Sequence, residues 1–177
     1  MNASLSEKDS PLVNGNPDIQ LVVFTLAGCE LAVEIHQVRE IIRVGEMTMM
    51  PKAPKFLEGI INLRGRIFPV LDFKKRFDMP QVDRTEETRI LVVESKDQVL
   101  GLLVDKVVEV LKVPSSAVEP LDHTLLTIGP DYTKGMVMTQ GRLILLLNLE
   151  KTFNLDDLKN LSDLESNSHR EGKPLGH

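Results

Sequence analysis

The sequence has little from which to build a disulfide framework, a zinc cluster or a nucleic-acid-binding surface. It contains 1 cysteine, no tryptophan and 4% aromatic residues among 177, and its formal net charge is −5. A single thiol excludes an internal disulfide and a zinc site made of several cysteines. Nucleic-acid binding would need a basic face and stacking rings, so we expect no such partner. No apolar run approaches the roughly 20 residues of a membrane helix, so we expect no membrane insertion.

The two ends of the chain are polar. Residues 1–17 are rich in Ser, Asn, Pro and Gly and lack the apolar centre of a secretory signal, which predicts a disordered leader and a cytoplasmic protein. Residues 154–177 begin with leucines at every third position and end in a polar stretch. This pattern predicts a short C-terminal helix followed by a disordered tail. The helix would pack on the folded domain, the favoured interpretation, or bind a partner.

Residue types that carry catalysis are present but scattered. The 4 histidines show no spacing typical of metal ligands, and Cys29 falls in a predicted turn with no assignable histidine base. Asp72 and Asp105 stand where we expect caps of a helix or turn, which is a commoner role than catalysis. No glycine-rich loop has the spacing that cradles phosphate. We therefore expect no enzyme activity, no metal and no cofactor.

Short runs of Val, Ile and Leu, separated by turn-forming residues, dominate the rest of the chain. They recur every eight to twelve residues, which is typical of a small β-barrel or sandwich. Residues 19–26 and 30–33 read as one hairpin, and residues 59–63 and 67–70 as a second that turns at Arg64-Gly65. A short helix is predicted from Asp72, which would cap it.

This pattern then repeats, which is the most informative property of the sequence. A shift of 69 residues lays Ile35–Val44 over Val104–Val113, and a shift of 76 lays Phe56–Ile67 over Tyr132–Leu143. The second copy therefore has a longer connector. Internal repetition implies two similar β units, expected at residues 18–83 and 84–153. A unit of about 65 residues buries too little surface to be stable alone, so the two should pack against each other.

Comparing the copies separates shared architecture from possible function. Arg66 and Arg142 occupy equivalent positions and are interpreted as structural, whereas the equivalent of Arg64 is Gln140. Glu40 has an acidic counterpart, Glu109, in the second copy, so a complete Arg and Glu pair is possible only in the first copy, which alone has the arginine. An arginine fork can grip a carboxylate with two hydrogen bonds, although a solvated turn arginine is the simpler interpretation.

Methionines gather at equivalent ends of the two copies. They are a source of adaptable partner surface, but filling gaps in a small core is the favoured role. The residues in question are Met47, Met49, Met50, Met136 and Met138.

A long motif gives the sequence a specific resemblance. It runs from Ile35 through Glu40 and continues over residues 50–72, which include Asn62-Leu63-Arg64-Gly65. Together with Gly101-x-x-Val104-Asp105 and residues 135–147, this motif strongly resembles the CheW-like chemotaxis coupling family across residues 19–153. The resemblance implies an all-β fold of two packed, pseudo-repeated five-stranded SH3-like barrels, in which the first strand can cross to the other barrel.

The resemblance also implies a function. Family members are non-enzymatic adaptors that join the tips of methyl-accepting chemotaxis receptors to a CheA-type histidine kinase, whose regulatory domain has a similar fold. The receptor helix would lie in a groove between the barrels, an established mode of recognition. The expected binding residues, carried over by position, are Val38, Glu40, Gly59, Asn62, Arg64, Gly101 and Val110.

Two alternatives remain from the sequence. An equivalent adaptor could serve a twitching, gliding or other non-flagellar receptor and kinase array. A barrel that binds a small ligand or an oligonucleotide belongs to a different class, but it would need a polar pocket or a basic aromatic groove, and the sequence shows neither plainly.

Overall fold

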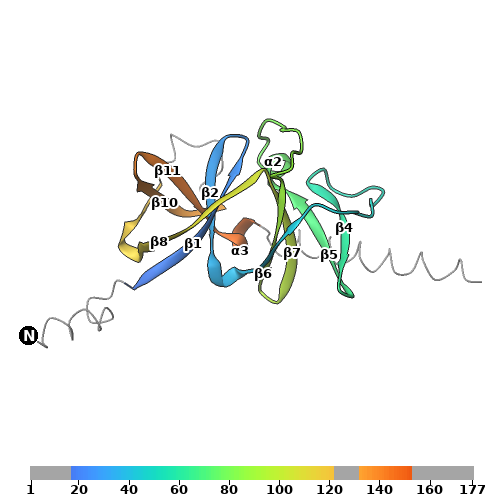
Figure 1. The fold of residues 1–177 in the computed structure, drawn as a ribbon, viewed down its shortest axis with the longest axis horizontal. Helices are drawn as coiled ribbons and strands as arrows, with labels where there is room; N and C mark the ends of the chain where they lie inside the picture. The colour runs from blue at the N-terminus through green and yellow to red at the C-terminus, as the bar shows by residue number, and fades with distance from the viewer. Residues whose placement is uncertain (1–16, 122–131, 153–177) are drawn as a thin grey trace, which may run out of the picture.

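The computed structural model describes residues 17–121 and 132–152, which form two lobes side by side (Figure 1). Eleven strands and four short helices make up this part of the chain. The first half contains β1 (Asp18–Leu26), β2 (Cys29–Glu34), η2 (Ile35–Gln37), β3 (Val38–Arg43), β4 (Leu57–Leu63), β5 (Arg66–Asp72) and α2 (Phe73–Arg76). The second half contains β6 (Arg89–Ser95), β7 (Gln98–Val104), β8 (Lys106–Pro114), η3 (Ser115–Ala117), β9 (Val118–Glu119), β10 (Thr133–Thr139), β11 (Arg142–Leu147) and α3 (Leu149–Thr152).

The strands form two sheets, one in each lobe. One has the order β8-β1-β2-β11-β10-β9, and the other has the order β3-β6-β7-β5-β4. Neighbours are antiparallel except for β2 with β11 and β5 with β7, which run parallel. We call the lobe of the six-stranded sheet barrel A and that of the five-stranded sheet barrel B. The expected all-β fold of two related barrels is confirmed.

The repeat holds element by element, but the hairpins are exchanged. Barrel B is one continuous segment, residues 38–104, and it lies in the chain between β2 and β8. Barrel A joins the first hairpin, β1 and β2, to strands β8–β11. The division expected at residues 83 and 84 therefore does not follow the sheets, because β6 and β7 pair with strands of the first half. More than the first strand crosses: a whole hairpin does.

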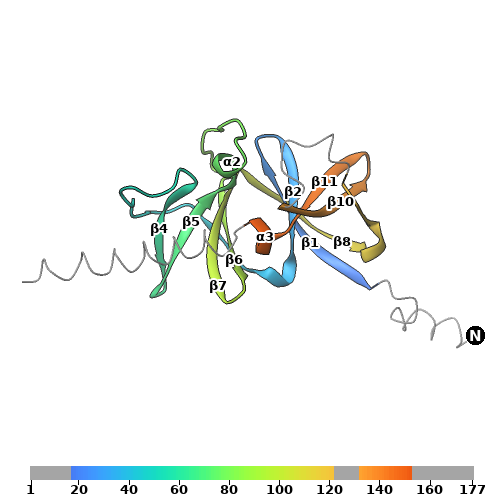
Figure 2. The same cartoon turned by 180° about the vertical axis from the view of Figure 1, so that it is seen from behind.

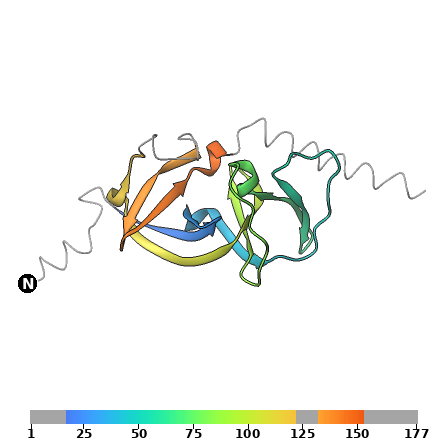
Figure 3. The same ribbon diagram turned by 90° about the horizontal axis from the view of Figure 1, so that it is seen from above.

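The chain passes between the lobes twice, once after β2 and once after β7. Figure 3 shows the blue segment that leaves barrel A and the yellow-green segment that returns to it. Seen from behind in Figure 2, α3 lies near the middle of the molecule. Only three residues separate β2 from β3, and only Asp105 separates β7 from β8. Such short links leave the barrels little freedom to separate.

Three apolar clusters account for the packing. One lies inside barrel A and includes Leu21 and Val23, and a second lies inside barrel B and includes Ile90 and Val92. The third and largest lies between the barrels and takes the alternate residues of the same strands, such as Val22. Side chains alternate across a strand, so strands buried on both faces must be apolar at successive positions. This explains why the runs in the sequence lack the usual polar alternation.

Four hairpins turn through pairs of residues with positive φ, which fit the twist of the flanking strands. The turn of β4 and β5 has φ values of 52° at Arg64 and 85° at Gly65, and its counterpart in the second copy has 50° at Gln140 and 74° at Gly141. The turn that the sequence predicted at Arg64-Gly65 is confirmed. The predicted cap is also confirmed, since a carboxylate oxygen of Asp72 accepts a hydrogen bond from the Lys74 backbone N–H at 2.8 Å.

The ends of the chain lie outside the described residues. The expected disordered leader, the C-terminal helix and the tail therefore stay predictions, and α3 ends at Thr152, before the stretch in which that helix was expected. In residues 17–121 and 132–152, no helix has the length and apolar character needed to span a membrane.

Candidate binding surface

The open end of barrel B carries the predicted Arg64 and Glu40 pair. Arg64 lies in the turn between β4 and β5, and Glu40 lies on β3, the opposite edge strand of the sheet. The guanidinium donates to the Glu40 carboxylate, and the side chains are 70% and 33% exposed. This contact joins the two edges of the sheet where it curls into a barrel. Most of its energy is screened by solvent, so its value lies in geometry rather than stability.

A pocket of about 340 Å³ opens at this end of barrel B. Its floor is formed by the apolar side chains of Phe68, Val92 and Val99, which are 2%, 3% and 8% exposed. Its rim consists of polar and charged residues together with Leu63: Arg39, Glu40, Arg64 and Arg66. Arg39 is held by Glu94, to which its Nε donates at 2.7 Å.

Barrel A carries a more complete arginine and glutamate cluster at the equivalent end. Arg142 grips Glu30 through two hydrogen bonds, from Nε at 3.0 Å and from Nη2 at 2.6 Å. Its Nη1 donates to Glu109 at 2.6 Å. The expectation that only the first copy can form an arginine and glutamate pair is therefore wrong. The sequence did align Arg66 with Arg142, but it gave no reason to expect Glu30 as the partner.

This cluster shifts the ionisation of its members. The hydrogen bond from Arg142 lowers the pKa of Glu30 below its ordinary value, and burial opposes that effect. The two carboxylates raise the pKa of Arg142. The ionised forms are therefore favoured on both sides, and the end of barrel A is closed by its own ion pairs.

Gly59 and Gly101 are buried within barrel B and line no surface. A Cβ atom at Gly59 would lie 2.9 Å from Met47 Cβ and 3.0 Å from the Thr48 backbone oxygen. At Gly101 it would lie 2.8 Å from Cγ2 of Ile90. All three distances are too short for contacts of a carbon atom, so these glycines allow neighbouring strands and side chains to approach. Their structural role is to support the packing of the barrel.

The other three predicted residues occupy separate places. Val38 on β3 packs against the cluster between the barrels. Asn62 accepts a hydrogen bond from the Gly65 N–H at 2.9 Å and so stabilises the turn. Val110 on β8 is 52% exposed and faces outward from barrel A. The seven residues therefore do not line one groove, because the space between the barrels is filled by the chain's own side chains.

The methionines divide between the two roles considered from sequence. Met47, Met50 and Met136 pack against the apolar clusters. Met49 and Met138 are 71% and 55% exposed. Met138 lies opposite Leu143, which is 44% exposed, in the hairpin of β10 and β11. Gap filling therefore explains three of the five.

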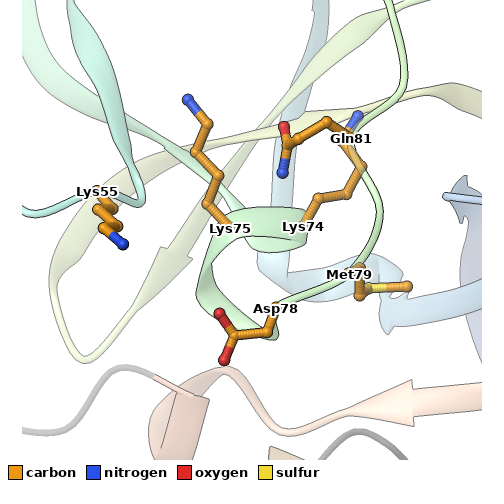
Figure 4. Close-up of a pocket in the computed structure, with 6 residues that line it drawn as sticks. All are labelled: Lys55, Lys74, Lys75, Asp78, Met79 and Gln81. Carbon is orange, nitrogen blue, oxygen red and sulfur yellow. The ribbon is translucent and has the colours of Figure 1, made fainter.

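A lysine-rich pocket beside α2 does not form an anion site. Figure 4 shows that the ammonium groups of Lys55, Lys74 and Lys75 do not converge on one point. Lys74 pairs with Asp105, and Lys75 donates to Glu58 at 2.5 Å. Two of the three cations are thus neutralised by carboxylates of the same chain.

The Lys74 contact links the two barrels. Its ammonium donates to one Asp105 oxygen, while the other oxygen accepts the Ala27 N–H at 2.7 Å. Lys74 belongs to α2 of barrel B, Ala27 belongs to the first turn of barrel A, and Asp105 is the link between β7 and β8. Asp105 therefore caps a turn, as expected, but a distant one. Its partner Lys74, whose side chain is only 4% exposed, could not be predicted from the sequence.

Asp72 is buried beside this link, and its environment is costly for a charge. Desolvation raises the pKa of Asp72 above its ordinary value of 3.8, against the hydrogen bond from the Lys74 backbone. Its role is to cap α2. Within residues 17–121 and 132–152, no three His, Cys, Asp or Glu side chains group in a way that could hold a metal ion.

Known proteins are similar to this chain in sequence. The chain matches the CheW-like domain over residues 20–157. It is 34% identical over 142 residues to chemotaxis protein CheW of Rhizobium meliloti (strain 1021), covering 80% of this chain and 90% of that protein. It is 35% identical over 129 residues to chemotaxis protein CheW of Bacillus subtilis (strain 168), covering 73% of this chain and 83% of the relative.

A solved structure agrees with the fold. The crystal structure of scaffolding protein TtCheW from Thermoanaerobacter tengcongensis superposes with a TM-score of 0.74 at 35% identity, covering 80% of this chain and 91% of that one. Protein FrzA of Myxococcus xanthus is 27% identical over 141 residues, which are 76% of this chain and 85% of FrzA. A family match across both barrels, with a solved relative of the same architecture, shows that the chain belongs to the CheW-like family.

Proposed function

We propose that this protein is a non-enzymatic adaptor that couples the signalling tips of chemoreceptors to a CheA-type histidine kinase in chemotaxis. The observation that carries the proposal is the match of both barrels to the scaffolding protein TtCheW, with a TM-score of 0.74. The relatives named chemotaxis protein CheW support the same pathway. The adaptor would act in the cytoplasm, at arrays of membrane-bound receptors.

The roles of the polar side chains that are held by hydrogen bonds and ion pairs support binding over catalysis. Asp72 caps α2, and Asp105 pairs with Lys74 and a backbone N–H. Arg142 is engaged by two carboxylates. A catalytic group needs to be within reach of a reacting atom. These side chains instead hold elements of the protein together, which suits a scaffold.

The proposed receptor surface lies on the outer faces of β3 and β8. Val110 and Ile41 occupy equivalent positions of the repeat and are 52% and 42% exposed. Each lies on the strand that follows a crossing between the barrels, with the predicted Val38 at the start of β3. An amphipathic helix gains affinity by burying apolar residues of this kind. Glu40 and Arg64 would shape the neighbouring end of barrel B without being the main contact.

The experiment is a coupling assay with purified components. The full chain is mixed with a CheA-type kinase and vesicles that contain a chemoreceptor, and kinase autophosphorylation is measured. The wild type is expected to raise phosphorylation only when the receptor is present. Val110→Asp should abolish this effect, whereas Val82→Asp, a control at a site that is 42% exposed, should not.

Two results would decide against the proposal. Failure of the folded wild type to couple kinase and receptor would reject the adaptor function. Equal coupling by Val110→Asp and the wild type would reject the receptor surface alone. Thermal unfolding of each variant verifies that it is folded before coupling is compared.

A second pathway is favoured by one observation. The relative FrzA of Myxococcus xanthus covers 76% of this chain, although its identity is lower than that of the CheW proteins above. An adaptor of a non-flagellar array would have the same fold and the same kind of partners. Identification of the receptors and kinase that co-purify with the chain from its own cells distinguishes the two pathways.

A further inference from the structure

The ends of the two barrels can be compared position by position. The registers of β11 with β2 and of β5 with β7 are equivalent, because Leu146 lies opposite Ala32 and its counterpart Val70 lies opposite Gly101. In barrel A, the Arg142 side chain reaches the Glu30 carboxylate. The equivalent positions in barrel B are Arg66 and Val99, and both line the pocket described above. Barrel B thus keeps the arginine but has valine where barrel A has its carboxylate.

The second carboxylate of the barrel A cluster also has a counterpart in barrel B, but that counterpart binds a different arginine. Glu109 of barrel A binds Arg142, whereas its equivalent in barrel B, Glu40, binds Arg64. Arg64 exists only in this copy, since Gln140 occupies the same turn position in the other. In the part of the chain that the structure describes, Arg66 forms no ion pair. Its guanidinium is left at the rim of an open pocket.

The rim therefore has a net positive charge. Arg39 is neutralised by Glu94 and Arg64 by Glu40, which leaves the charge of Arg66 uncompensated. This occurs on a chain whose formal net charge is −5. The buried apolar floor lowers the local dielectric and strengthens an ion pair formed above it. The site is complementary to a single anionic group.

We propose that Arg66 binds a side-chain carboxylate of a partner protein, in the way that Arg142 binds Glu30 within this chain. The guanidinium fork favours the planar, bidentate geometry of an Asp or Glu side chain. The inference rests on the proposed function and assigns the carboxylate to the kinase's regulatory domain. A pocket of about 340 Å³ at a barrel end suits one projecting loop, whereas a receptor rod needs an elongated surface.

The test measures binding of the full chain to the regulatory domain of a CheA-type kinase by isothermal titration calorimetry. Arg66→Gln removes the fork at an exposed position and should weaken binding about tenfold, because a charge-assisted hydrogen bond is lost. Val99→Glu supplies the carboxylate within the chain, as Glu30 does in barrel A, and should weaken binding similarly. Lys112→Gln is the control, since it removes one exposed positive charge from barrel A.

Val99→Glu also tests the geometry without any partner. In the wild-type background the new carboxylate should pair with Arg66, so the variant should be more stable than the same change combined with Arg66→Gln. If Val99→Glu does not fold, the binding of Arg66→Gln still decides the outcome.

The outcomes separate this inference from the proposed function. Wild-type binding that Arg66→Gln leaves unchanged would overturn the Arg66 site and leave the adaptor function intact. An equal loss in Lys112→Gln would show that overall charge matters and would also overturn it. If binding of a receptor-tip fragment depends on Arg66, the bound carboxylate belongs to the receptor, which would overturn its assignment to the kinase. Absence of wild-type binding to the kinase domain would reject the inference together with the kinase contact.

Discussion

The ammonium group of Lys74 is bound by Asp105, and this buried contact joins α2 of barrel B to the segment that returns the chain to barrel A. The same carboxylate accepts a hydrogen bond from Ala27 in the first turn of barrel A. Three segments from both barrels thus meet at one carboxylate. The apolar cluster between the barrels supplies most of the burial, and this polar contact adds a specific link between them.

Removing this carboxylate should destabilise the protein strongly. Asp105→Ala leaves the Lys74 charge buried without a partner, which typically costs about 3–5 kcal/mol. Urea unfolding followed by circular dichroism measures the loss. Glu87→Gln is the matched control, because its pair with Lys106 has side chains that are 62% and 52% exposed and should contribute less than about 1 kcal/mol. Equal effects of the two changes would contradict the role assigned to Asp105.

The arginine clusters should differ in their effect on stability. Arg142→Gln breaks contacts to two carboxylates around a side chain that is 27% exposed, whereas Arg64→Gln breaks one contact of a side chain that is 70% exposed. We expect Arg142→Gln to lower the free energy of unfolding more than Arg64→Gln does, because it breaks more charge-assisted hydrogen bonds around a less exposed side chain. The free energy of unfolding in urea provides the comparison. A larger loss of stability from Arg64→Gln than from Arg142→Gln would contradict the conclusion that the Arg142 cluster is the structural one.

The Arg142 cluster also predicts a dependence on pH. The pKa of Glu30 is lowered in the folded protein, so the stability it contributes is present above the ordinary value of 4.5 and is lost as the pH falls through the folded pKa. The difference in stability between the wild type and Glu30→Gln should therefore shrink below pH 4.5. Unfolding curves between pH 7 and pH 3 measure it, and a difference that stays constant would contradict the pairing.

Asp72 should make stability depend on pH in the opposite direction. Its pKa is raised in the folded protein, so the folded state loses stability as the pH rises through that value. Asp72→Asn keeps a good capping residue without the buried charge, and it should be more stable than the wild type at pH 7 but equal to it below pH 3.8. Asp72→Ala removes the cap and should cost about 1 kcal/mol. Thermal unfolding at both pH values tests the three proteins, and a less stable Asp72→Asn at pH 7 would count against the burial argument.

The buried glycines give a test of their structural role. A methyl group at Gly101 would lie 2.8 Å from Ile90 and 3.0 Å from Val70, so Gly101→Ala should cost about 1–3 kcal/mol through overpacking. Gly45→Ala is the control, since nothing lies within 4 Å of its added methyl group. Chemical unfolding measures both variants. Partner binding by Gly101→Ala should fall only as far as its folded fraction falls.

Several features of the fold could be predicted because they depend on residues that are close together in the sequence. The turn at Arg64-Gly65, the cap at Asp72 and the register of the repeat all depend on residues close together in sequence. The apolar pattern could not predict the hairpin exchange, because the first hairpins of the two copies have nearly the same pattern; only the family resemblance indicated that the first strand can cross. Leu21 and Ile90 are equivalent and equally buried, and neither reveals which barrel it enters.

The candidate site was harder to predict than the fold. The Arg64 and Glu40 pair was expected, but Arg142 and Glu30 lie 112 residues apart and meet only because β2 crosses to barrel A. Gly59 and Gly101 were expected at a binding surface and lie inside the barrel instead. Such positions affect binding through packing, and sequence resemblance alone does not distinguish packing from contact.

The insertion of residues 38–104 between β2 and β8 has a consequence for synthesis on the ribosome. The hairpin of β1 and β2 emerges first, yet β8, β10 and β11, which complete its barrel, are translated last. Barrel B, made from one uninterrupted stretch, can close while the ribosome is still working. The first hairpin therefore packs against its native partner strands last, and Leu21 and Val23 remain without those contacts until translation is nearly finished.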